Sequence, residues 1–144
     1  MALLAALGTL LKTGNGASPE VFTTVSQVGN ITGPGVKADT IDVSNHNQAN
    51  AYKQFIAGLK EGGDVKFVLF FDPSDVTQNQ TGAQGLLLLL ENRVVTNFQL
   101  ALPTSPAVKW SFAGLVVDFA NKYDVNGALM ADVTIKVSGK PALA

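Results

Sequence analysis

The chain has 144 residues, of which 47% are hydrophobic and 15% charged, with ten basic residues against eleven acidic ones. This length suits a single domain with a sizeable core, and the lack of a cationic excess argues against tight electrostatic binding of nucleic acid. The absence of cysteine excludes disulfides and thiolate metal sites.

The amino terminus reads as an apolar arm. The run MALLAAL at residues 1–7 has no preceding positive charge, unlike a signal peptide, and it is too short to span a bilayer. We therefore expect no membrane insertion. A strand, a tight turn at Gly14-Asn15-Gly16 and an antiparallel return over residues 21–31 should follow. An arm this apolar needs a partner surface.

A glycine-rich stretch, Thr32-Gly33-Pro34-Gly35, comes next. A phosphate loop needs consecutive backbone N–H groups with a helix start behind them. Pro34 has no N–H, and the residues after Gly35 resemble a strand. Proline followed by glycine is typical of a type II turn, so we predict a turn here and no phosphate site.

Asp42, Ser44 and His46 would alternate onto one face if this strand continued far enough. A catalytic relay requires the histidine to lie between the serine and the acid, whereas here the histidine and aspartate would be about 13 Å apart. The same separation argues against a shared metal ion. We expect no catalytic, cofactor or metal site. A small hydrolase using Asp39 or Asp42 stays an alternative if a second acid or histidine converges on them.

Two segments favour short helices. Residues 50–60 place Ala51, Phe55, Ile56 and Leu59 at helical spacing before Gly62-Gly63, and residues 83–92 hold five consecutive leucines before Glu91.

The remaining segments favour strands. Residues 94–102 and 129–138 alternate apolar and polar side chains, which indicates half-buried strands with one polar face. Residues 64–72 and 108–119 are apolar on both sides, so we expect them to be covered on both faces. The chain is thus predicted to be a single, mainly β domain of six or seven strands with two short helices.

The segment ITGPGVKADTIDVSNHNQANAYKQFIAGLKEGGDVKF resembles the centre of the major tail tube proteins of long-tailed phages. GTLLKTGNGASPEVFTTVSQVGNI is similar to the opening hairpin of that family, and GLLLLLENRVVTNFQLALP to its second helix and following strand. WSFAGLVVDF and ADVTIKVSGKP resemble its closing strands. The resemblance covers nearly the whole chain.

The resemblance implies a barrel-like β-sandwich of residues 1–144, with an arm and hairpin at residues 1–20 and an assembly loop with a short helix at residues 33–63. Such subunits form hexameric rings that stack into a hollow tube, with strands of neighbouring subunits joined in a continuous β-barrel. The fold is similar to that of the type VI secretion tube protein.

The implied partners are further copies of the chain, the tape measure, tail terminator and tail tip proteins, and double-stranded DNA in transient passage. The implied location is the virion tail, after assembly in the host cytoplasm. The alternatives are a tube component of a phage-like secretion system and a monomeric β-sandwich binding module.

Two sets of residues follow as candidate sites. For subunit contacts we select apolar residues of the amino-terminal arm and residues of the assembly loop: Leu3, Leu4, Leu7, Gly33, Pro34, Gly35, Tyr52, Phe55 and Ile56. A channel for DNA should present polar groups without a cationic excess, because each lysine near phosphate adds attraction. The candidates for this lumen are Lys37, Asp39, Asp42, Asp64, Lys66 and Asp72.

Overall fold

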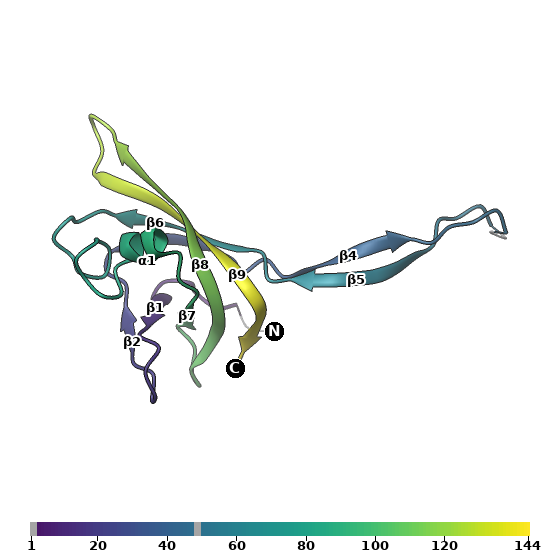
Figure 1. Ribbon diagram of the computed structural model, residues 1–144, viewed down its shortest axis with the longest axis horizontal. Coiled ribbons are helices and arrows are strands. Elements are labelled where there is room, and N and C mark those ends of the chain that lie inside the picture. Colours follow the sequence, from purple (N-terminus) through teal and green to yellow (C-terminus); the bar gives the residue numbers. More distant parts are fainter. Residues whose placement is uncertain (1–2, 48–49) are drawn as a thin grey trace.

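The computed structural model describes residues 3–47 and 50–144, which form nine strands and one helix (Figure 1). The elements are β1 (Leu10–Gly14), β2 (Phe22–Thr24), β3 (Val28–Thr32), β4 (Lys37–Asp42), β5 (Phe55–Glu61), β6 (Asp64–Phe70), α1 (Leu86–Asn92), β7 (Thr96–Leu102), β8 (Val108–Tyr123) and β9 (Leu129–Leu143).

Seven strands form one antiparallel sheet in the order β2-β1-β7-β8-β9-β6-β3. The long strands β8 and β9 carry it through two halves, and β8 changes register with β9 at two places along its length. The first layer contains β2, β1, β7, residues 108–114 of β8 and residues 137–143 of β9. The second layer contains residues 115–123 of β8, residues 129–136 of β9, β6 and β3.

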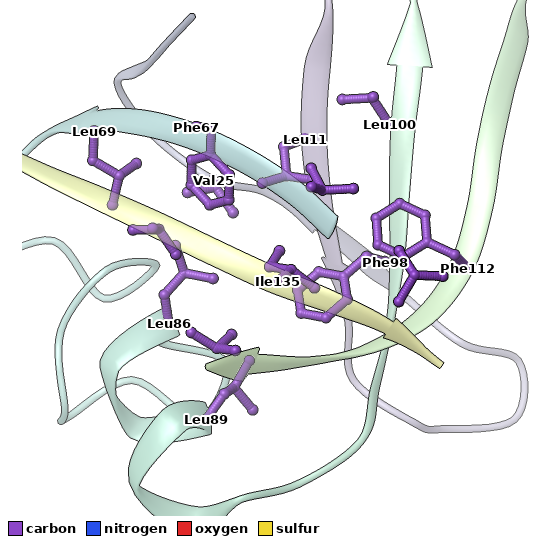
Figure 2. Close-up of a cluster of buried hydrophobic side chains, with 14 of the residues drawn as sticks. Leu11, Val25, Phe67, Leu69, Leu86, Leu89, Phe98, Leu100, Phe112 and Ile135 are labelled. Carbon is purple, nitrogen blue, oxygen red and sulfur yellow. The ribbon is translucent and has the colours of Figure 1, made fainter. Parts of the chain in front are cut away.

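The two layers share a single hydrophobic core, so the domain is sandwich-like. Figure 2 shows Leu11, Phe98 and Phe112 of the first layer in the same buried cluster as Phe67 and Ile135 of the second. The rings of Phe98 and Phe112 stack with their centroids 5.8 Å apart. Helix α1 adds Leu86 and Leu89 to this cluster. No helix among the described residues is long and apolar enough to cross a membrane.

The loop between β6 and α1 is held by a buried glutamine. Gln78 is fully buried, donates from its side-chain amide to the Ser26 carbonyl oxygen at 2.8 Å, and accepts from the Asp72 backbone N–H at 2.9 Å. Buried polar groups need such partners, and these bonds tie the loop to the segment between β2 and β3.

The remaining two strands, β4 and β5, pair only with each other. They form a hairpin that projects from the sandwich (Figure 1). From here on, the arm means this hairpin of β4 and β5, and not the apolar amino terminus. The helix expected over residues 50–60 is therefore wrong, because Phe55–Glu61 is strand β5. A short apolar run fits either period. Pairing with the strand residues of β4 decides the outcome, and Gly58 disfavours a helix interior.

Several other predictions need correction. The return over residues 21–31 is split, since β2 pairs with β1 but β3 pairs with β6. The turn after β1 is a longer loop that closes where the Asn15 N–H donates to the Val21 carbonyl oxygen. The helix expected at residues 83–92 is confirmed as the shorter α1. Residues 1 and 2 of the predicted arm at the amino terminus lie outside the described part.

The strands expected to be covered on both faces are covered on one. In β6 the residues Val65, Phe67 and Leu69 are buried, whereas Lys66 and Phe70 are exposed. In β8 the buried residues are Phe112, Gly114 and Val116, and Val117 is exposed. The alternating strands β7 and β9 are confirmed. Phe98 and Leu100 are buried in β7, and residues 131, 133, 135 and 137 are buried in β9.

Candidate functional site

The arm exposes an unusual amount of apolar surface. Every residue of β4 is exposed, and in β5 only Gly58 is partly covered. The exposed apolar side chains of the arm and its tip are Val36, Ile41, Val43, Tyr52, Phe55, Ile56 and Leu59. A two-stranded hairpin is at best marginally stable alone in water, so the arm requires a covering surface.

Apolar side chains lie on both faces of this hairpin. Ile41 and Ile56 are directly paired across the two strands and therefore share one face. Phe55 is paired with Asp42 and lies on the opposite face. Ile41, Ile56 and Phe55 are each about half exposed, at 50%, 54% and 55%. Covering one face would leave the other in water, which distinguishes this arm from an ordinary half-buried hairpin.

Glycines shape the base of the arm. Gly33 has φ +115°, and a Cβ there would clash with the Asp64 carbonyl oxygen. Gly63 has φ +69°, and a Cβ there would clash in the same way with the Gly35 carbonyl oxygen. The predicted type II turn is wrong, because it needs positive φ at the glycine after Pro34, whereas the positive φ is at Gly33. Residues 33–36 instead connect the sandwich to the arm.

An ion pair lies beside these glycines. The Lys37 ammonium is 3.0 Å from the Glu61 carboxylate, across the first rung of the arm. The hydrogen bond between them raises the pKa of Lys37 and lowers that of Glu61. Both groups are exposed, so the pair orients the two strands more than it stabilises the fold.

The tip of the arm contains the residues that resembled a catalytic triad. Strand β4 ends at Asp42, so the alternation does not reach His46. The Ser44 N–H donates to the Asp42 carboxylate at 2.9 Å, and the Ser44 hydroxyl accepts from the Gln54 N–H at 2.8 Å. Hydrogen bonds from the Ser44 side chain and backbone lower the pKa of Asp42. These hydrogen bonds close the tip of the hairpin, so Asp42 and Ser44 have a structural role there.

Within residues 3–47 and 50–144, no group of three histidine, cysteine, aspartate or glutamate side chains is placed to hold a metal ion.

One of the three amino-terminal leucines borders a groove. Leu3, Leu4 and Leu7 are all exposed. Leu7 lines a cavity of about 760 Å³ between the chain start, β3 and β7, together with Val28, Ile31, Leu100 and Leu102. The lining of the groove is mainly apolar, and the groove runs beside β3, a strand at the end of the sheet.

The outer face of the second layer holds the charged side chains of that layer, and the apolar Val68, Phe70 and Met130 lie on the same face. Strand pairing places its charged side chains on the side away from the core: Lys66, Lys122, Lys136, Asp64, Asp118 and Asp132. Lys122 lies 3.3 Å from Asp132, and Lys136 lies 3.5 Å from Asp64. Three lysines and three aspartates cancel, so this face, which we call the polar face, is charged but has no net charge.

The structure separates the predicted lumen residues into three places. Asp64 and Lys66 lie on the polar face. Lys37, Asp39 and Asp42 lie on the arm. Asp72 lies in the loop after β6, where its carboxylate accepts from the backbone and side chain of Ser74 at 3.0 and 2.7 Å.

Of the predicted contact residues, Phe55 and Ile56 lie on opposite faces of β5, Tyr52 lies in the tip loop before that strand, and residues 33–35 lie at the base of the arm. Sequence reasoning missed the arm residues Ile41 and Leu59, and the polar-face residues of β8 and β9. The period-two alternation over residues 129–138 carried the signal for the latter, since Asp132 and Lys136 are on its polar side.

Comparison with known proteins gives a family. A family model described as lambda phage tail tube protein matches residues 8–144. No curated protein matches the chain.

Solved structures that share this fold include chains from tail and tube structures. The tail of an empty gene transfer agent particle, refined with C6 symmetry, contains a chain with a TM-score of 0.75 at 14% identity, covering 99% of both chains. The virion of a native gene transfer agent contains one with a TM-score of 0.73 at 13% identity, again covering 99% of both. A sheath/tube terminator structure of an extracellular contractile injection system matches with a TM-score of 0.70 at 9% identity, covering 100% of this chain and 98% of the other.

Proposed function

This chain belongs to the lambda phage tail tube protein family, and from this premise we propose that it assembles into six-membered rings stacked into the hollow tail tube through which DNA leaves the particle. The family and the tail and tube neighbours make the chain a structural tail tube subunit. Six copies per ring is supported by the C6 symmetry of the gene transfer agent tail that shares the fold.

The observation that carries this proposal is the arm. Its two faces hold Ile41 and Ile56 on one side and Phe55 on the other, all half exposed in the single chain. Contiguous exposed apolar surface of this kind marks a protein interface. Because both faces are apolar, we assign the arm to a position between two neighbouring subunits, one covering each face. Leu3, Leu4 and Leu7 would add a second contact.

The polar face suits the wall of the channel. Its three lysines are matched by three aspartates, and two of the pairs are in direct contact. A wall with a cationic excess would hold DNA through its phosphates, and a strongly acidic wall would repel it. A surface with equal numbers of positive and negative side chains neither holds nor repels DNA strongly. We therefore assign Asp64 and Lys66 to the lumen and place Lys37, Asp39 and Asp42 with the arm.

The proposed setting follows from the family. The tube would be assembled in the host cytoplasm and would meet the tape measure, terminator and tail tip proteins in the virion. No catalytic role is assigned, because the one acid and serine that resembled a site bond each other within the hairpin tip. Tubes of contractile injection systems share the fold, but the family match favours the phage tail.

Sedimentation velocity and negative-stain microscopy of the purified chain test this function. We expect rings of six copies and hollow tubes as the concentration rises. The matched control replaces residues 37–61 with a short glycine linker, which removes the arm and leaves the sandwich strands in place. The control should stay monomeric. A wild-type chain that remains monomeric at every concentration, or a control that assembles equally well, would contradict the proposal.

A further inference from the structure

The loop between β1 and β2, residues 15–21, begins with an asparagine followed by a glycine. Asn15 and Gly16 are both exposed, and Gly16 has φ +73° with open space where a Cβ would lie. Because glycine has no side chain, the Gly16 backbone nitrogen is open to approach. This nitrogen and the side-chain carbonyl carbon of Asn15 are close along the chain, so a bond between them would close a small ring, a succinimide.

A carboxylate accepts a hydrogen bond from the nitrogen that would attack. The Gly16 N–H donates to Glu20 Oε2 at 2.8 Å. The other oxygen of this carboxylate, Oε1, accepts from the Asn97 side-chain amide of β7 at 2.9 Å, which fixes the direction of Glu20. Gly14 makes room for it, because a Cβ at Gly14 would clash with the Glu20 carboxylate. A general base must lie within hydrogen-bond reach of the proton that it takes, and Glu20 does so.

The side-chain oxygen of Asn15 is held by two backbone donors. The N–H groups of Ala17 and Val21 donate to Asn15 Oδ1 at 3.0 and 3.1 Å. Donors at about this distance stabilise a carbonyl oxygen that gains negative charge during attack on its carbon. Both bonds are to the oxygen, and the side-chain nitrogen, which has to leave, belongs to an exposed residue. The loop thus supplies a nucleophile, a base and an oxyanion site around one amide.

We propose that Asn15 is a modification site at which the chain deamidates itself. Glu20 takes the proton of the Gly16 N–H as the Gly16 nitrogen bonds to the side-chain carbonyl carbon of Asn15. The N–H groups of Ala17 and Val21 stabilise the charge that develops on Oδ1. The bond from this carbon to the side-chain nitrogen then breaks, and the nitrogen leaves as ammonia with the proton that Glu20 returns. Water opens the succinimide at either carbonyl, which leaves aspartate or isoaspartate at position 15.

The two products differ in what they do to the loop. Either one replaces a neutral amide by a carboxylate, so each modified copy gains a negative charge beside Glu20. Aspartate keeps the oxygen that accepts from Ala17 and Val21, and these hydrogen bonds become charge-assisted. Isoaspartate leads the main chain through the former side chain and lengthens the loop, which closes where the Asn15 N–H donates to the Val21 carbonyl oxygen at 3.1 Å. This inference concerns the single chain and does not depend on the tube function.

A second asparagine-glycine pair, Asn126-Gly127, has different surroundings. It lies in the turn between β8 and β9 and is likewise exposed. The Gly127 N–H donates to the Asp124 backbone carbonyl oxygen at 3.2 Å, and not to a carboxylate. A backbone carbonyl is a far weaker base than a carboxylate. The same dipeptide without the base is therefore a control within the same molecule.

Peptide mapping of the purified full chain by mass spectrometry tests the site. The folded chain is kept at neutral pH, and the conversion of Asn15 and Asn126 to aspartate and isoaspartate is followed in the same samples. Digestion in heavy-oxygen water separates conversion during handling from conversion before it. Glu20→Gln keeps the size of the side chain and a hydrogen-bond acceptor but removes the base. Glu91→Gln is the matched control, because the Glu91 carboxylate accepts from the Gln80 side chain away from this loop.

We expect Asn15 to convert about tenfold faster than Asn126, less than the roughly 10²- to 10⁴-fold contribution of a base in an enzyme, because the loop is exposed to water. Glu20→Gln should lower the rate at Asn15 to that at Asn126, and Glu91→Gln should change neither rate. In wild-type chain unfolded with urea, the two asparagines should convert at equal rates.

Two results would overturn the proposal. One is an Asn15 that converts no faster than Asn126 in the folded wild-type chain, which would mean that the hydrogen bonds hold the loop against ring closure. The other is a Glu20→Gln variant that melts like wild type and still converts Asn15 at the wild-type rate. If this variant does not fold, the comparison of folded with urea-unfolded wild-type chain decides, and an Asn15 rate that unfolding leaves unchanged would refute a role for the loop.

Discussion

Truncating Phe55 should weaken assembly and leave the isolated fold almost intact. Phe55 lies on the arm, 55% exposed in the single chain, and packs against no part of the sandwich core. An aromatic side chain has about 150 to 250 Å² of surface, so the exposed 55% of Phe55 amounts to roughly 80 to 140 Å². At about 25 cal/mol per Å², covering this area stabilises a subunit contact by about 2 to 3.5 kcal/mol.

The Phe55→Ala variant should therefore assemble about 30- to 300-fold less tightly than wild type, since about 1.4 kcal/mol corresponds to a factor of ten. The assay is the critical concentration for ring and tube formation, measured by light scattering. Urea unfolding of the monomer should show a loss well below about 1 kcal/mol, because the side chain has few contacts to lose.

Two control variants bracket this result. Phe98→Ala removes a core ring that is 1% exposed and should cost about 3 to 5 kcal/mol of folding stability. Val125→Ala removes a side chain that is 99% exposed at the β8–β9 turn and should change neither property. If Phe55→Ala lowers monomer stability as Phe98→Ala does, while the folded fraction assembles normally, Phe55 is ordinary core and the role given to the arm is refuted.

Three further outcomes are expected. Asp132→Lys converts the Lys122–Asp132 ion pair on the polar face into a repulsion. It should preserve the fold and the tubes but slow DNA release from phage particles, whereas the control Asp39→Lys on the arm should not slow it. Equal release rates from particles proven to contain each variant would show that the polar face does not line the lumen. Gly33→Ala should lower the melting temperature and the free energy of unfolding by about 1 to 3 kcal/mol, because φ is positive there and the new Cβ would clash with Asp64. In the control Gly35→Ala the new Cβ meets nothing within 4 Å, so stability should not change. Identical melting curves for the two variants would contradict this. Gln78→Met should cost about 2 to 4 kcal/mol in urea unfolding, because two partly buried backbone groups lose their partner. A neutral result would mean that water replaces the amide.

The strands that line the core were predictable because burial on one face imposes a period of two. Residues 94–102 and 129–138 alternate, and the structure buries the expected side chains of β7 and β9. The helix at residues 83–92 was predictable as a type but not in extent. Its leucines carry no periodicity, since they form an unbroken run, and its length is set by Gly85 and by Arg93 in the left-handed conformation.

The arm could not be predicted in the same way, because neither of its faces is buried in the single chain. Ile41 and Ile56 on one face and Phe55 on the other remove the alternation that marks a half-buried strand. The spacing of Phe55, Ile56 and Leu59 then fitted a helix equally well. The polar face was partly predictable, since Asp64 and Lys66 were selected, but its pairing with Lys136 and its extension onto β8 depend on strand order.

A cryo-EM reconstruction of tubes assembled from the wild-type chain tests the central claim most directly. It should show rings of six copies with the polar face of β6, β8 and β9 toward the channel, and each arm held between two other subunits with Phe55 and Ile56 both covered. A channel lined by the arm, or an arm left exposed on the outside of the tube, would contradict the account.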